Sequence, residues 1–154
     1  MPYKVSHGKA VQTTYSVDEV FSRIQHEGIQ FIDLQFTGLT GHFHHTTISA
    51  STFTPEQMKN GLPKLDGSSI IGFTSIEDSD LLLKPDPNTF AIIPWMTENK
   101  TARLLCDVYW GEDRGRLSRD PRGIAQNAEK YIKTQGFDFS TWGPEVEFFV
   151  FDKV

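Results

Sequence analysis

Two β-rich runs separated by a glycine-containing gap limit the folds open to this chain. The first run covers residues 29–36 and alternates between two faces. One face carries Phe31, Asp33 and Gln35, and the other carries Ile32, Leu34 and Phe36. Gly38 and Gly41 follow, and a second run covers about residues 42–48. Alternation broken by a short glycine loop is typical of antiparallel strands, so the pattern predicts a β-hairpin.

A helix is predicted directly before this hairpin, over about residues 16–27. Ser16 and Glu19 have the spacing of a capping box, in which each side chain satisfies the backbone amide of the other. One helical face is apolar and carries Val17, Val20, Phe21 and Ile24. Gly28 is a natural end for the helix. A helix beside a sheet indicates an α+β fold.

The pattern along the rest of the chain is more varied. A short helix is expected after a Thr54 cap, over about 55–59. Residues 60–79 are mostly Gly, Ser, Asp and Pro without a sustained period, which predicts a loop that is either mobile or functional. Short strands are expected at about 80–84, 89–94 and 102–109.

The last third of the chain begins with a charged, glycine-containing stretch at 111–118, which is a candidate domain boundary. Asp120 and Pro121 then form a typical helix start, and Gly136 closes the predicted helix. A final strand is predicted over about 144–151.

Charge and composition exclude several classes of protein. Twenty acidic residues against fifteen basic ones give a net charge of −5, which argues against a nucleic-acid partner. The only cysteine, Cys106, lies among apolar residues and is expected to be a buried, inert thiol. No signal-like run opens the chain, and no stretch approaches the ~20 apolar residues of a membrane span. These features predict a cytoplasmic protein without a membrane partner.

Two glutamates in the predicted last strand are a candidate metal site. Glu145 and Glu147 would share one face of the strand with Phe149 and Phe151. Because the other face is also apolar, both carboxylates would lose hydration unless cations neutralise them or the strand end is wet. Paired carboxylates can hold one divalent ion, or one ion each. The alternative is a solvated strand end, since Glu-x-Glu is a common tripeptide.

Asp66 lies in a second candidate site, the segment Asp-Gly-Ser-Ser at 66–69. Glycine allows a tight turn close to a ligand, and an aspartate there can bind a cation or accept a proton. The same composition is also that of an ordinary turn. His42 and His44 would share a strand face, but two ligands do not complete a zinc site, so zinc is not favoured.

Several spaced segments occur in one order along the chain: 31–37, 66–70, 77–80, 84–86, 119–122 and 143–149. In that order they closely resemble the type I glutamine synthetases of bacteria and archaea. The resemblance covers nearly the whole chain from about residue 16. It implies an N-terminal arm at 1–15, a β-grasp domain at 16–112, and at 113–154 the first helix and strand of a truncated catalytic domain.

The resemblance also implies an activity and the residues that serve it. The family ligates ammonia to glutamate with ATP as substrate, through γ-glutamyl phosphate. Asp66 would bind ammonium and take its proton, Ser69 would help to hold that cation, and Asp80 matches a further family acid nearby. Glu145 and Glu147 would be ligands of the paired Mg²⁺ or Mn²⁺ site. The active sites would lie between subunits of a homo-oligomer, a dodecamer, with the Asp66 loop reaching into a neighbour's site.

Two departures from the family pattern limit these expectations. Where the family loop often continues with two glycines and a tryptophan, this chain has Ile71, Gly72 and Phe73, so the nucleotide-side contacts do not carry over. The remaining metal ligands, the nucleotide pocket and the glutamate-binding arginines would lie beyond Val154, so the fragment alone is predicted to be inactive. Two alternatives stay open: a non-catalytic β-grasp module for regulation or subunit contact, and a related amide ligase with another carboxylate substrate.

Overall fold

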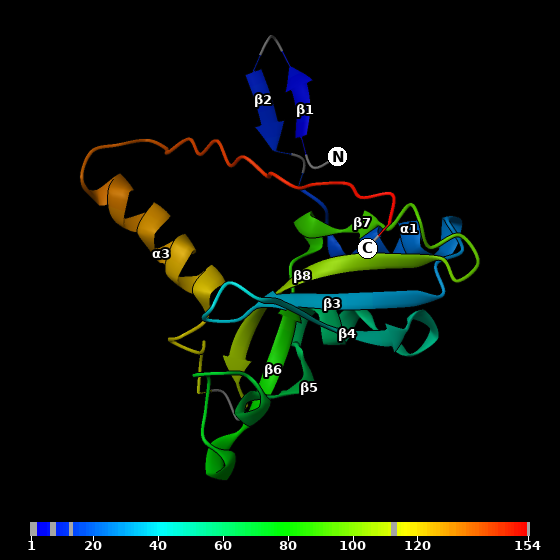
Figure 1. The fold of residues 1–154 in the computed structure, drawn as a ribbon, viewed down its shortest axis with the longest axis horizontal. Helices are drawn as coiled ribbons and strands as arrows, with labels where there is room; N and C mark the ends of the chain where they lie inside the picture. Colours follow the sequence, from blue (N-terminus) through cyan, green and yellow to red (C-terminus); the bar gives the residue numbers. More distant parts are fainter. Residues whose placement is uncertain (1–2, 7–8, 13, 112–113, 154) are drawn as a thin grey trace. The chain divides into compact units, whose positions relative to one another are not determined.

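A strongly curled sheet organises the larger part of the molecule. The computed structural model describes residues 3–6, 9–12, 14–111 and 114–153. The sheet has the strand order β4–β3–β8–β6–β5, with β7 also paired to β8 (Figure 1). Its strands are β3 (Phe31–Thr37), β4 (Phe43–Ser49), β5 (Leu62–Asp66), β6 (Asp80–Pro85), β7 (Ala91–Ile92) and β8 (Thr101–Trp110). Only β3 and β8 run parallel among the described pairs, and the others are antiparallel.

The chain divides into two compact units, residues 1–124 and 125–154. A separate two-stranded sheet is formed near the start of the first unit by β1 (Tyr3–Ser6) and β2 (Lys9–Gln12). Within the described residues, no helix is long and apolar enough to cross a bilayer.

The first helix, α1 (Val17–His26), forms where the capping box predicts it. The Ser16 hydroxyl accepts a hydrogen bond from the Glu19 amide at 3.2 Å, and the Glu19 carboxylate accepts one from the Ser16 amide at 2.7 Å. A cap of this kind stabilises a helix by about 1 kcal/mol. Val20 and Ile24 are buried, and Gly28 turns the chain away with a φ of 64°. The predicted helix and its capping box are confirmed.

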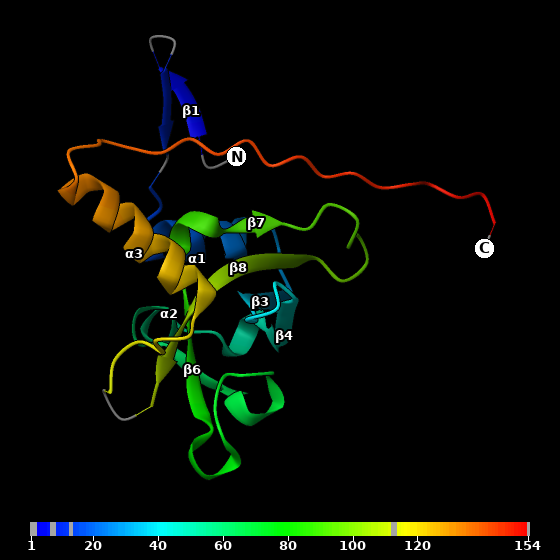
Figure 2. The same cartoon turned by 60° about the vertical axis from the view of Figure 1, so that its left-hand side comes forward.

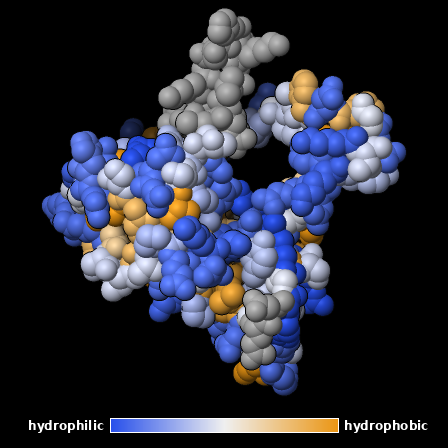
Figure 3. Space-filling view, turned by 180° about the vertical axis from the view of Figure 1, so that it is seen from behind, coloured by the Kyte–Doolittle hydropathy of each residue, from blue (hydrophilic) through white to orange (hydrophobic). Residues whose placement is uncertain are grey.

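The core lies between α1, α2 (Pro55–Asn60) and one face of the sheet. The second helix has its own capping box, from Thr54 and Gln57. The fully buried side chains include Val20, Ile32, Leu34, Met58, Leu62, Leu81, Leu83, Leu104 and Val108. Each buried aliphatic side chain contributes roughly 1.5–3 kcal/mol. Seen from behind, mostly hydrophilic residues cover the surface and the apolar ones form separate patches (Figure 3).

Strand β8 supplies the centre of this core. The even-numbered residues from Ala102 to Val108, which are Ala102, Leu104, Cys106 and Val108, are all buried. Burial, and next the negative charge of Asp107, raise the pKa of the Cys106 thiol above its ordinary value. The expectation of a buried, inert cysteine is therefore confirmed.

Two local predictions need correction within the sheet. Residues 60–79 are not wholly loop, since β5 lies there. This strand pairs only with β6, and a register shift between Leu62 and Leu65 removes the alternation that would have revealed it. The strand expected at 89–94 is reduced to β7, because the Asp86 carboxylate caps a 3₁₀ turn at Pro87–Thr89.

The second unit contains most of α3 (Pro121–Thr134), and Gly136 follows with a φ of 87°. This confirms the predicted helix start and end. The strand predicted at 144–151 is wrong: the chain there is extended but forms no ladder (Figure 2). A strand needs a hydrogen-bonded neighbour, and the described residues supply none at this point. As a result Phe148 and Phe149 remain 77 % and 87 % exposed.

Candidate functional site

Asp66 lies where β5 ends and a 3₁₀ turn begins. Its Oδ1 accepts hydrogen bonds from the amide and the hydroxyl of Ser68, at 2.9 and 2.7 Å. Its Oδ2 accepts one from the Ser69 hydroxyl at 3.2 Å. These donors, the Ser68 hydroxyl first and its amide next, hold the pKa of the exposed Asp66 carboxyl below the usual 3.8. The side chain is therefore an oriented anion at neutral pH.

Asp80 is the direct partner of Asp66 across the β5–β6 ladder. Opposed residues on antiparallel strands point to the same face, and two like charges in that position repel. Among the described residues no cationic side chain pairs with Asp80, whereas Asp78 close by is held by Arg114 at 2.7 and 2.8 Å. The strand ends therefore present two exposed carboxylates to solvent, an arrangement that a small cation would stabilise.

Gly67 allows the backbone just after Asp66 to pack closely against Thr74 and Leu81. Its amide donates to the Ser79 carbonyl at 2.7 Å, and it is itself buried. A Cβ atom at this position would lie 2.4 Å from Thr74 Oγ1 and 2.6 Å from Leu81 Cδ1. Since no side chain fits there, only glycine lets the Asp66 turn sit against β6 in this way.

The turn continues to Phe73, where the sequence departs from the family pattern. The Phe73 ring is 1 % exposed and packs against Phe36, with 6.3 Å between ring centroids. It belongs to the core and offers no stacking surface to a nucleotide. Ile71 is 79 % exposed, and Gly72 provides the positive φ of 80° that the turn requires.

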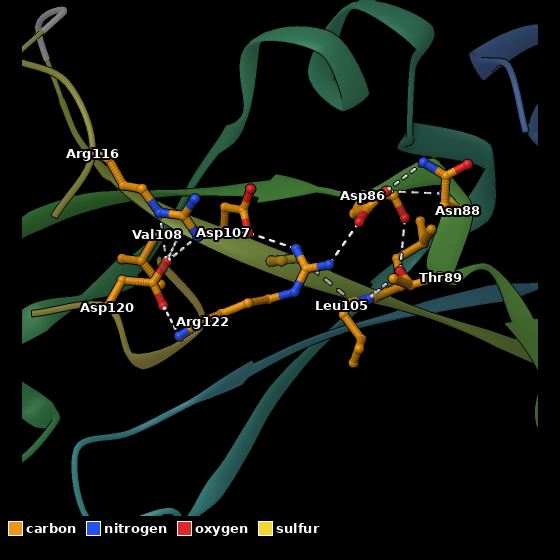
Figure 4. Close-up of polar contacts among 11 residues, drawn as sticks. Asp86, Asn88, Thr89, Leu105, Asp107, Val108, Arg116, Asp120 and Arg122 are labelled. Carbon is orange, nitrogen blue, oxygen red and sulfur yellow. Dashed lines mark hydrogen bonds and ion pairs between the residues drawn. The ribbon is translucent and has the colours of Figure 1, made fainter. Parts of the chain in front are cut away.

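An ionic network fixes the first turn of α3 onto the sheet (Figure 4). The Arg122 guanidinium donates to Asp86 Oδ2 at 2.6 Å and to Asp107 Oδ1 at 2.5 Å, so it bridges the end of β6 and strand β8. Burial alone would lower the pKa of Arg122, but these two carboxylates raise it above its ordinary value. Arg122 is therefore a permanent cation between two anions.

Asp120 is the most deeply buried carboxylate in the same network. Its side chain is 0 % exposed. Oδ2 accepts from Arg116 Nε and Nη2 at 2.9 and 2.6 Å and from the Val108 amide at 3.2 Å, while Oδ1 accepts from the Arg122 amide at 3.1 Å. Arg116 also reaches Asp107 at 2.7 Å. The sequence marked Asp120 only as a helix cap. Its partners Arg116 and Arg122 lie close by along the chain, and the contact with the Val108 amide depends on how β8 packs against the start of α3.

Glu145 and Glu147 lie in the extended segment after α3, and both are exposed. As hard oxygen donors they suit Mg²⁺ or Mn²⁺ in kind. In number they do not suffice, because the described residues contain no group of three or more acidic, histidine or cysteine side chains that could hold a metal ion. The two glutamates therefore supply at most part of a metal site.

The histidines have packing and hydrogen-bonding roles. His44 stacks on Phe36 at 5.3 Å between ring centroids, and His42 meets His44 edge-on at 4.6 Å. His45 contacts Asp33 at 2.7 Å. No local pattern predicted this last pair, since the two residues meet across the β3–β4 register.

Sequence profiles identify the family of the chain. The profile of the glutamine synthetase beta-Grasp domain matches residues 28–111, more than half of the chain. The profile of the glutamine synthetase catalytic domain matches residues 118–154. The chain belongs to the glutamine synthetase family. This confirms the resemblance seen in the motifs, and the α+β, β-grasp fold expected from it.

Curated relatives of this glutamine synthetase family member match along most of its length. It is 52 % identical over 136 residues to glutamine synthetase of Sulfolobus acidocaldarius, covering 88 % of this chain and 28 % of the relative. It is 46 % identical over 141 residues to that of Aquifex aeolicus, covering 91 % and 30 %. A 3-hydroxylaminophenol mutase of Cupriavidus pinatubonensis is 41 % identical over 140 residues, covering 90 % and 29 %. The chain thus spans less than a third of these relatives.

Solved structures agree on the fold. The cryoEM structure of Plasmodium falciparum glutamine synthetase superposes with a TM-score of 0.70 at 20 % identity, covering 80 % of this chain and 24 % of that one. Apo GmaS without ligand gives a TM-score of 0.65 at 22 % identity, covering 75 % and 26 %. At these identities the likeness concerns the fold alone.

Proposed function

We propose that this chain supplies the ammonium-binding loop and part of the metal site of a glutamine synthetase, which ligates ammonia to glutamate with ATP. The observation that carries the proposal is the pair Asp66 and Asp80, which places two anions at the ends of paired strands, in a member of this family. The chain's role rests on these strand ends and on the glutamates after α3.

In this proposal Asp66 has two tasks. Its ionised carboxylate, oriented by Ser68 and Ser69, attracts ammonium, and Asp80 adds a second negative charge on the same face. Asp66 then accepts one proton from ammonium, which leaves neutral ammonia with a free electron pair. Ammonia attacks the carbonyl carbon of γ-glutamyl phosphate, the C–N bond forms and phosphate leaves. The acyl phosphate itself arises when the glutamate side chain attacks the γ-phosphate of ATP and ADP departs.

Glu145 and Glu147 are proposed as two ligands of the Mg²⁺ or Mn²⁺ ions. Bound divalent ions neutralise the charge of the phosphate oxygens during transfer. Because the two glutamates are only part of a ligand set, other groups must complete the site. We therefore propose that residues 1–154 alone form no glutamine, and that activity belongs to a longer polypeptide with a β-grasp domain at 16–112 and a catalytic domain from residue 113.

The loop geometry also favours a homo-oligomer. The turn that carries Asp66 and Ser69 faces solvent, and Ile71 beside it is 79 % exposed. We propose that this turn enters the active site of a neighbouring subunit, within a dodecamer in the cytoplasm.

Two other functions compete with this proposal. The relative from Cupriavidus pinatubonensis is named a mutase, which is a different activity from glutamine formation. This name favours the alternative that the chain belongs to a family member acting on another substrate. A non-catalytic module for regulation or subunit contact would need neither Asp66 nor the glutamates.

The test compares wild type with Asp66→Asn in the protein as its gene encodes it. Wild type should form glutamine from glutamate, ammonia and ATP, and Asp66→Asn should lower turnover by about 100-fold or more while ATP binding is kept. Glutamine formation that is unchanged in Asp66→Asn removes Asp66 from the mechanism. If wild type forms no glutamine, the synthetase assignment itself fails.

A further inference from the structure

The turn that carries Asp66 is held at two ends. At its start, the Gly67 amide donates to the Ser79 carbonyl at 2.7 Å, which ties it to the residue just before β6. At its far end, the carbonyl groups of Gly72 and Phe73 accept hydrogen bonds from a single side chain, Arg119. The first tie comes from the residue that precedes the neighbouring strand, whereas the second comes from a residue almost fifty positions later.

Arg119 reaches both carbonyl groups through one nitrogen atom. Its Nη1 donates to the Gly72 oxygen at 3.0 Å and to the Phe73 oxygen at 3.2 Å. Bonds from a charged donor are stronger than neutral ones, and a carbonyl group at the end of a turn has no ladder partner of its own. Arg119 therefore closes the turn that begins at Asp66.

The backbone that carries Arg119 is itself rigidly placed. Leu117 is 2 % exposed and its amide donates to the Val108 carbonyl at 2.9 Å. Asp120 is buried within the ionic network, and its amide donates to the Leu117 carbonyl at 3.1 Å. Although the Arg119 side chain lies at the surface, its starting point is fixed on both sides to β8 and the first turn of α3.

The turn between the two ties contains exposed residues that need such support. Ile70 and Phe73 are buried, but Ser69, Ile71 and Gly72 between and beside them face solvent. Gly72 has a positive φ, which glycine adopts readily, but it has no side chain that could anchor the turn. Without Arg119, this end of the turn would lose its charged donor and would rely on the Phe73 amide bond to the Ile70 carbonyl at 3.0 Å, the burial of Phe73 and the Leu39 side chain beside Gly72.

We propose that Arg119 is a positioning residue for the ammonium step: it holds the turn from Gly67 to Phe73 so that Asp66 and Ser69 keep their mutual geometry. This inference rests on the proposed function for its catalytic consequence, but the tether itself is a property of the loop. Arg119 touches no reacting atom and acts through Gly72 and Phe73.

The experiment uses three variants in the protein as its gene encodes it. Arg119→Met removes the donors while keeping side-chain length, and Arg119→Lys keeps one cationic donor. Arg103→Met is the matched control, an exposed arginine on β8 away from the loop. Hydrogen–deuterium exchange of peptides covering 67–73 reports on the tether, and KM values for ammonium, glutamate and ATP report on its consequence.

Arg119→Met should speed exchange in 67–73 alone and raise the KM for ammonium about tenfold, since small misplacements of a reacting group are costly, while the KM for ATP stays within about twofold. Arg119→Lys should recover part of both effects, and Arg103→Met should change neither. Exchange in 67–73 equal to that of Arg103→Met overturns the tether. A rise in all three KM values together, with faster exchange throughout the chain, overturns the positioning role. If wild type forms no glutamine, the proposed function is contradicted but the tether is not, because the hydrogen–deuterium exchange result does not depend on activity.

Discussion

Asp80 lies directly opposite Asp66 in the β5–β6 ladder, so that two carboxylates leave the ends of adjacent strands on one face. Such a pair costs stability when no cation is present. A positively charged ligand bound at this face would remove that cost. The strand register thereby places both carboxylates where the proposed ammonium step needs them.

Neutralising Asp80 should separate these two effects. Asp80→Asn keeps the size of the side chain but removes one charge, so we expect the KM for ammonium to rise about tenfold, the equivalent of one lost charge interaction near the surface. The midpoint of urea unfolding should stay the same or rise, because the repulsion with Asp66 is gone. Ammonium titrations of turnover, with urea melts beside them, test both points. A KM for ammonium equal to that of wild type would exclude Asp80 from the cation site.

Loss of the Asp120 side chain should weaken the attachment of α3. Asp120→Ala takes away the buried carboxylate that accepts hydrogen bonds from Arg116 and from the Val108 amide, and we expect the free energy of unfolding to fall by about 3 kcal/mol. Asp120→Asn keeps an acceptor for the amides but not the charge, so its loss should be smaller. Urea unfolding followed by circular dichroism gives both values. Equal losses in the two variants would contradict a role for the ionic pair.

A methyl group at Gly67 should disturb the Asp66 turn. Gly67→Ala places Cβ 2.4 Å from Thr74 Oγ1 and 2.6 Å from Leu81 Cδ1, so the strand and turn must separate, at a cost of about 1–3 kcal/mol. Gly143→Ala is the control, because its Cβ would meet nothing within 4 Å. Thermal melts of the two variants, together with ammonium-dependent turnover, check the prediction. A melting temperature for Gly67→Ala that matches Gly143→Ala would refute the close approach.

Asp33 should make part of the stability dependent on acid. Burial alone would raise the pKa of the Asp33 carboxyl, but hydrogen bonds from His45, Gln35 and Thr47 outweigh it and hold the pKa below the ordinary 3.8. A carboxyl with a lowered folded-state pKa contributes stability that is present above the unfolded value and lost as the pH falls through the folded one. Asp33→Asn should therefore lose less stability than wild type between about pH 5 and pH 3.

Urea midpoints measured across this pH range test the prediction for Asp33. Asp152→Asn, at an exposed position, serves as the control and should follow the wild-type curve. The idea fails if the Asp33→Asn and wild-type curves stay parallel down to pH 3.

Removal of one proposed metal ligand should weaken Mn²⁺ binding. Glu147→Gln keeps the shape of the side chain but gives up the negative charge, and we expect Mn²⁺ affinity to fall at least about tenfold, with turnover falling alongside. Glu98→Gln is a matched control at an exposed glutamate between β7 and β8. Isothermal titration with Mn²⁺ on the protein as its gene encodes it measures the change. Affinity equal to that of Glu98→Gln would place Glu147 outside the metal site.

Local patterns predicted the elements whose signals are local. The capping box at Ser16 and Glu19, the hairpin around Gly38 and Gly41 and the start of α3 at Asp120 all appear where neighbouring residues specify them. Strand β5 was missed, because a strand paired on one side with an irregular register needs no alternation. The prediction of a strand around Glu145 was wrong for the opposite reason. Its sequence suits a strand, but a strand forms only beside a hydrogen-bonded partner.

The sequence by itself determined the family, the α+β class and the chemical types of the candidate site, since motif order, capping and hydrophobic alternation are all carried by residues close together in the chain. Only the tertiary structure decided which of those residues meet. Asp66 faces Asp80 through strand register, Phe73 is drawn into the core by Phe36, and Arg119 reaches the carbonyl groups of Gly72 and Phe73. These contacts join positions distant in sequence, and their energies depend on distances that the packing of β8 and α3 sets.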